Sequence, residues 1–239
     1  MDTINHRKKY IMVLDIETAN FLDDAIAYDV GFAIADRKGN IYESRSLMIG
    51  EMFINHADLL QSAYYADKLP SYWKDYANGE RKMTSILTAK KIVADLMRKY
   101  RVTDVFAYNA SFDLNGLNRS IRYITKSKYR YFFPYGTKIH CIWNMACQTI
   151  LQQKAFFKFA VENGLVKENG NVMTSAETAY RYICKDNDFT EAHTGLEDVK
   201  IETAILAKCY RQHQKMETSI NRACWQLPQK KFKNFAETY

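Results

Sequence analysis

The chain has 239 residues, of which 47% are hydrophobic and only three are Pro, so a well-packed globule is expected and a largely disordered chain is excluded. The formal net charge of +7 favours a polyanionic partner such as nucleic acid, because Lys and Arg side chains that neutralise phosphates release counterions. Five cysteines without a CxxC pair argue against a zinc ribbon and for a reducing compartment, and no apolar run is long enough to span a membrane, which predicts a soluble, cytoplasmic protein.

Continuous apolar runs predict buried strands in the first half of the chain. Residues 10–14 form the first run, and residues 29–36 and 41–49 predict two further strands. Lys38-Gly39-Asn40 is a turn sequence, so these last two strands should form a hairpin. Residues 102–108 predict another buried strand. Strands followed by helical segments are typical of an α/β domain.

Helices are predicted where apolar residues recur with a period near 3.6. The clearest pattern covers residues 86–100, and shorter ones cover residues 112–124, residues 175–184 and the segment from Leu196 to Tyr210. A loop is expected around Leu69-Pro70, and residues 139–150 are strand-like before the chain turns helical towards Phe159. The simplest organisation is a single domain over residues 1–239, with a basic C-terminal extension from about residue 208.

Two carboxylates follow the first apolar run, in the segment Asp15-Ile16-Glu17-Thr18. In a strand, side chains at i and i+2 lie on the same face, so Asp15 and Glu17 would lie together on a buried element. Two like charges in a poorly solvated place are costly unless a cation compensates them, and Mg²⁺ or Mn²⁺ prefers such oxygen ligands. The alternative is that both carboxylates lie in solvent beyond the strand end.

Two later segments also carry acids where a helix begins. In Tyr108-Asn109-Ala110-Ser111-Phe112-Asp113 the acid follows a strand, and it could be a helix-start residue favoured by the dipole. In His193-Thr194-Gly195-Leu196-Glu197-Asp198 a continuous helix would separate His193 from Asp198 by about 140°. Gly195 suggests instead that His193 lies on a loop and Asp198 in the first turns, so that both can converge on one site. A histidine beside metal ions is a suitable general base.

These three segments, in this order, resemble the three exonuclease motifs of the DEDDh family. That family includes the proofreading subunit of bacterial replicative polymerases, ribonuclease T and oligoribonuclease. The resemblance covers roughly residues 10–212 and implies an RNase H-like fold, in which a mixed sheet is flanked by helices on both faces. His193 lies five residues before Asp198, which favours the histidine subclass over the tyrosine subclass.

The resemblance implies a 3′→5′ exonuclease with two Mg²⁺ or Mn²⁺ ions per site. Asp15 would bridge both ions, Glu17 and Asp198 would complete the site of the nucleophile-side ion, and Asp113 would hold the second ion. His193 would accept the proton of the attacking water. The partner would be nucleic acid with a free 3′ end, and the products would be nucleoside 5′-monophosphates.

Other residues near the acids are candidates for contact with the substrate. Thr18 and Asn109 match family positions near the terminal nucleotide, although both residue types also form helix caps and turns. Phe21 or Phe112 could stack on a base, with core packing as the alternative for Phe112. Asp23-Asp24 is interpreted as a solvated loop rather than a third metal site.

The substrate is less constrained than the chemistry. Residues 50–101 and 125–174 match no family pattern, and such regions form the walls that select the substrate. Single-stranded DNA is favoured. The alternatives are an RNA-directed 3′ exoribonuclease, a proofreading partner that contacts a polymerase through the tail around residues 225–235, and a non-catalytic nucleic-acid-binding module.

Overall fold

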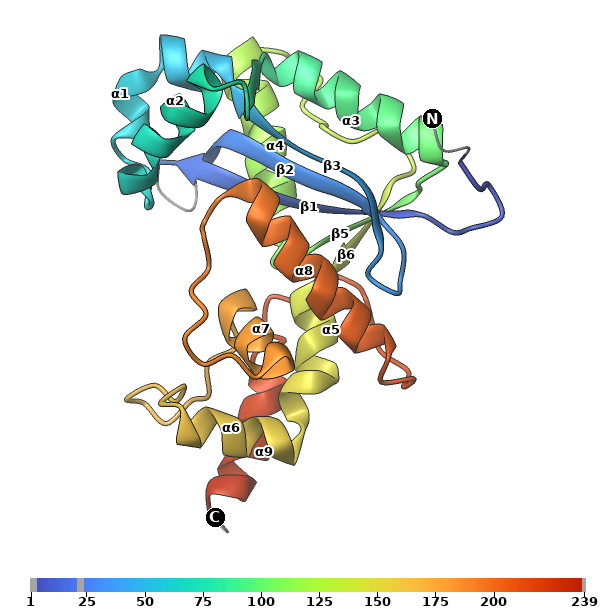
Figure 1. The fold of residues 1–239 in the computed structure, drawn as a ribbon, viewed down its shortest axis with the longest axis vertical. Coiled ribbons are helices and arrows are strands. Elements are labelled where there is room, and N and C mark those ends of the chain that lie inside the picture. Colours follow the sequence, from blue (N-terminus) through green and yellow to red (C-terminus); the bar gives the residue numbers. More distant parts are fainter. Residues whose placement is uncertain (1–3, 21–23, 238–239) are drawn as a thin grey trace.

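A mixed sheet lies at the centre of the part of the chain that the computed structural model describes, residues 4–20 and 24–237 (Figure 1). Its six strands have the order β4-β3-β2-β1-β5-β6. Strands β1, β2 and β3 form an antiparallel meander, whereas β4, β5 and β6 each pair in parallel with a neighbour. The strands are β1 (Ile11–Ala19), β2 (Ile26–Ala35), β3 (Ile41–Ile49), β4 (Lys82–Thr84), β5 (Asp104–Ala107) and β6 (Lys138–Cys141).

The two faces of the sheet pack into two separate cores, which explains the apolar runs. In β1, alternate side chains point to opposite faces. Leu14 belongs to one core cluster and Val13 to the other. Asp15 and Glu17 continue the face of Val13 towards the carboxyl end of the strand. A strand that is buried on both faces therefore ends in two carboxylates on one side.

Helices cover both faces of the sheet (Figure 1). On one face lie α3 (Ile86–Tyr100) and α4 (Ala110–Thr125), and on the other lie α5 (Ile142–Gln148) and α8 (Gly195–Tyr210). None of the helices in the described ranges combines the length and apolar character needed to cross a bilayer. The remaining helices are α1 (Ala57–Leu60), α2 (Leu69–Ala77), α6 (Lys154–Glu162), α7 (Ala176–Cys184) and α9 (Gln226–Ala236), with short helical turns at Glu51–Asn55, Ala66–Lys68 and Ile150–Gln152.

Most of the predicted elements are confirmed. The mixed sheet with helices on both faces is present, and the predicted helix over residues 86–100 has these same bounds. It begins after Ser85, whose hydroxyl accepts a hydrogen bond from the amide of Thr88 at 3.1 Å. In the basic extension, α9 packs the Phe232 ring against that of Phe157, with centroids 5.4 Å apart. Partner binding by this tail stays a prediction.

Two local predictions are wrong. The segment at Leu69-Pro70 is not a loop, because α2 begins there, and the first turn of a helix tolerates a residue without an amide proton. The strand predicted over residues 139–150 ends at Cys141, and α5 follows directly. Apolar runs of this length do not distinguish a strand from a buried helix. Strand β1 is longer than the run over residues 10–14, so Asp15 and Glu17 lie within it.

Candidate active site

The predicted catalytic residues converge on one cleft of about 720 Å³. β1 supplies two of the acids, and the first turns of α4 and α8 supply one acid each. The side chains that the sequence singled out and that line the cleft are Asp15, Glu17, Thr18, Asn109, Phe112, Asp113, His193 and Asp198. Phe21 and Asp23 lie outside the described residues, and Asp24 lines a neighbouring groove.

Three of the acids are tightly grouped. Asp15, Glu17 and Asp198 each offer a carboxylate oxygen, and these oxygens lie within 4.8 Å of one another. Glu17 and Asp198 are 8% and 4% exposed, so water solvates their charges poorly. Asp113 is 5% exposed and faces the same cleft from α4.

A close contact between α8 and β2 brings Asp198 to this group. Gly31 lies opposite Asp15 in the β1–β2 pair. A Cβ atom on Gly31 would lie 2.0 Å from the carbonyl oxygen of Gly195, the first residue of α8. Only a residue without a side chain allows this approach. The start of α8 therefore lies directly on the sheet beside the two acids of β1.

Asp29 holds the start of α8 in that place, although the sequence did not single it out. Its carboxylate is fully buried and accepts a hydrogen bond from the amide of Gly195 at 3.2 Å. It also accepts hydrogen bonds from Tyr72 at 2.8 Å and Ser46 at 2.6 Å. Arg81 forms a salt bridge with it at 3.3 Å. One buried carboxylate thus connects β2, β3, α2 and α8 behind the cleft.

Burial raises the pKa values of the grouped acids. Desolvation raises the pKa of Glu17 to about 9, that of Asp198 to about 8 and that of Asp113 to about 7. The pKa of Asp15 is also well above its usual value, through desolvation and then the charges of neighbouring acids. None of the described residues that line the cleft is Lys or Arg. No lysine or arginine in the described part of the cleft lining therefore offsets the charge of these acids.

Glu202 is a further cleft acid that the sequence analysis missed. It lies one helical turn after Asp198 on α8, and it is only 3% exposed. Desolvation raises its pKa well above the usual value. The spacing of four residues from Asp198, which places both side chains on one helix face, is the signal that could have found it.

The donor set fits a divalent cation. The cleft offers carboxylate oxygens, which are the ligands that Mg²⁺ and Mn²⁺ prefer. Asp198 Oδ1 and Glu202 Oε2 are buried and have no hydrogen-bond partner among the described residues. Buried polar atoms are rarely left without a partner, so the two unpartnered oxygens are consistent with a ligand that binds in the cleft.

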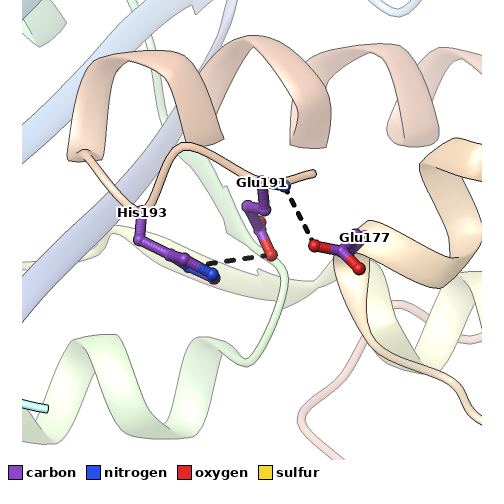
Figure 2. Close-up of side chains that lie close together, drawn as sticks. All are labelled: Glu177, Glu191 and His193. Carbon is purple, nitrogen blue, oxygen red and sulfur yellow. Dashed lines mark hydrogen bonds and ion pairs between the residues drawn. The ribbon is translucent and has the colours of Figure 1, made fainter. Parts of the chain in front are cut away.

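His193 lies at the rim of the cleft, on the loop before α8. Its backbone has φ 53°, in the left-handed region. The imidazole stacks on Tyr65, with ring centroids 3.8 Å apart and planes 11° apart. Its Nδ1 lies 4.0 Å from Glu191, whose own amide donates to Glu177 at 2.9 Å (Figure 2). Burial lowers the pKa of His193, so its neutral form is favoured at neutral pH.

Glu177, Glu191 and His193 also lie close enough to share an ion, with one ligand atom from each within 4.8 Å of the others. Arg181 already forms a salt bridge with Glu177 at 2.8 Å. This arginine partly neutralises the group. This group therefore differs from the acids of the cleft, which have no such salt bridge among the described residues.

Comparison with solved structures places this fold among RNase H-like nuclease folds. The chain is similar to E. coli exonuclease I in its zinc-bound complex with single-stranded DNA (TM-score 0.52, 13% identity, 87% of this chain and 41% of that chain). It is similar also to that enzyme in complex with a dT13 oligonucleotide (TM-score 0.52, 11% identity, 86% of this chain and 42% of that chain). The chain thus spans less than half the length of these neighbours. No protein-family model and no curated protein matches the sequence.

Proposed function

We propose that this protein is a metal-dependent 3′→5′ exonuclease of the DEDDh type. The observation that carries the proposal is the convergence of Asp15, Glu17, Asp113 and Asp198 on one cleft, which has no Lys or Arg among its described lining residues. The motifs at these residues and the fold shared with exonuclease I support the same reading. Such a cluster has raised pKa values and orphan oxygens unless cations bind to it.

The carboxylates would hold two divalent cations. Asp15 would contact both ions, Glu17 and Asp198 would complete one site, and Asp113 would serve the other. Bound cations supply positive charge to a scissile phosphate and lower the pKa of a nearby water. The part of the protein is to fix these oxygens on rigid elements, because phosphoryl transfer depends on positioning and charge stabilisation.

His193 would act as the general base. Its lowered pKa leaves an imidazole nitrogen free to take the proton of the attacking water near neutral pH. Stacking on Tyr65 restricts the ring, and Glu191 lies beside Nδ1. The imidazolium that forms would be stabilised by the charge of Glu177, which opposes the effect of burial on the pKa of His193.

The substrate would be a nucleic-acid strand with a free 3′ end, with single-stranded DNA favoured. Thr18, Asn109 and Phe112 line the cleft and would contact the terminal nucleotide. The similar exonuclease I structures contain single-stranded oligonucleotides, which supports DNA over RNA. Release of nucleoside 5′-monophosphates follows from cleavage on the 3′-oxygen side of the phosphate.

The test is degradation of matched DNA and RNA strands labelled at the 5′ end, with Mg²⁺, with Mn²⁺ and with EDTA. We expect a descending ladder that requires metal and that is lost in Asp15→Asn. Asp95→Asn removes an exposed carboxylate on α3 and is the matched control. Activity in EDTA, or in Asp15→Asn, would refute the proposal. A ladder on RNA alone would make the protein an exoribonuclease with the same site.

A further inference from the structure

The surface that leads away from the cleft along α4 is strongly basic. The sequence contains no acidic residue between Asp113 and Glu162. Within that stretch, five basic residues follow the cleft end of α4 closely: Arg119, Arg122, Lys126, Lys128 and Arg130. Positive charge on this scale attracts a polyanion.

The helical spacing gathers part of this charge on one face of α4. Residues 115, 119 and 122 lie within about 60° of one another around the helix axis, at 100° per residue. Lys126 directly follows the last residue of α4 and lines the same groove as Arg119 and Arg122. Arg119 lines two neighbouring grooves, one of about 310 Å³ and one of about 610 Å³. The smaller groove shares Phe112 with the cleft, and the larger shares Asn20 with it. The basic face is therefore continuous with the site of the proposed chemistry.

Two of these cations are available for a ligand. Arg122 and Lys126 are exposed and form no salt bridge with any residue in the described ranges. On α3, by contrast, Lys91 and Arg98 both pair with Asp95. Among the described residues that line the larger groove, Asp24 is the one acid. The groove therefore carries a net positive charge.

Exposed tyrosines are interleaved with the basic residues. Tyr123, Tyr129 and Tyr131 are 39%, 72% and 66% exposed. The ammonium group of Lys126 lies 4.8 Å from the centre of the Tyr123 ring. Cations that follow a phosphate backbone, with aromatic rings on which bases stack, are typical of surfaces that bind single strands.

We propose that this surface, made of the exposed face of α4 and residues 126–131, binds the single strand upstream of its 3′ terminus. Arg122 and Lys126 contact phosphates, and Tyr123 and Tyr129 stack on bases. The inference rests on the proposed function for the position of the 3′ end. Arg119, Arg122 and Lys126 line one groove, so their charges can follow one stretch of the phosphate backbone.

The test is the salt dependence of binding in EDTA, measured by anisotropy with a 5′-labelled single strand of about 16 nucleotides. Two lost phosphate contacts lower the slope of log Kd against log salt by about 1.4 in the double variant Arg122→Gln/Lys126→Gln. Lys230→Gln/Lys231→Gln removes the same charge from the exposed side of α9 and is expected to keep the wild-type slope.

A second readout uses catalysis. Wild type is expected to have a lower KM for the long strand than for a dinucleotide. In Arg122→Gln/Lys126→Gln, the ratio of the dinucleotide KM to the long-strand KM is expected to fall by about tenfold. A wild-type slope in this variant, or an equal loss in the α9 variant, would overturn the inference. Binding needs no cleavage, so a protein that binds as expected but never cleaves would refute the proposed function alone. Equal Tm values exclude misfolding of the variants.

Discussion

Replacement of Asp198 by Asn should stabilise the metal-free protein while it abolishes activity. In the cleft, desolvation raises the pKa of Asp198 from 3.8 to about 8. The folded protein therefore keeps a proton here that the unfolded chain has lost. Over this range of pH the folded state binds more protons, so the free energy of unfolding falls as the pH rises from about 4 to about 8.

The magnitude follows from the same pKa change. A rise from 3.8 to about 8 corresponds to about 6 kcal/mol, at about 1.4 kcal/mol for each pKa unit. Glu17 shares a hydrogen bond with Asp198 and can keep a proton when Asp198 loses its own. The two acids then share one charge, so the actual cost of ionising Asp198 is much smaller than about 6 kcal/mol. We expect Asp198→Asn to raise the free energy of unfolding by about 1–3 kcal/mol at about pH 8, which raises Tm by about 2–12 °C for a chain of this size.

The assay is thermal unfolding in EDTA between about pH 5 and pH 8.5, followed by circular dichroism. Wild type should lose stability with rising pH, and Asp198→Asn should lose less, by up to about 1.4 kcal/mol for each pH unit. Addition of Mg²⁺ or Mn²⁺ should reverse the order, because only wild type retains the full ligand set. A variant that is less stable than wild type in EDTA at about pH 8 would refute the electrostatic argument.

Three further predictions concern the same site. His193→Gln is expected to lower kcat by about 100-fold or more. In wild type, protonation of the imidazole should lower the rate at acid pH, with a midpoint below 6.5, the usual pKa of histidine, and His193→Gln should lose this acid limb of the pH–rate profile. Glu202→Gln should weaken metal binding in calorimetric titrations, and unchanged affinity would show that its orphan oxygen serves no ion. Gly31→Ala should lower Tm and also the metal affinity, because its methyl group would strike the carbonyl of Gly195.

The local motifs predicted which side chains meet in one cleft, because each motif lies where an element begins or ends. Asp15 and Glu17 follow from strand alternation, and their cluster was predictable from the residues of β1 alone. The position of His193 on a loop before α8 is also confirmed, and its φ of 53° explains why the helix does not begin there. Such signals depend on neighbours within a few residues of the chain.

The supporting residues were not predictable in this way, because their partners are distant in sequence. Asp29 meets Gly195 across 166 residues, and Tyr65 meets His193 from a segment without a recognisable pattern. In the sequence, Asp29 is merely the first residue of an apolar run. Its full burial becomes intelligible only when Arg81 and Tyr72 are found beside it.

Gly195 has both a local signal in the sequence and a long-range contact in the structure. From the sequence it was interpreted as a break that separates His193 from the helix. In the structure it is the first residue of α8, and its amide donates a hydrogen bond to Asp29. Its absent side chain has a second effect, since it meets Gly31 at backbone distance and lets α8 lie on the sheet. Removal of either glycine would move Asp198 and His193 together, because both are attached to the start of the same helix. The proposed metal ligand Asp198 and the proposed base His193 therefore depend on one packing contact. A loss of metal affinity in Gly31→Ala should be accompanied by loss of the acid limb of the pH–rate profile that we assign to His193.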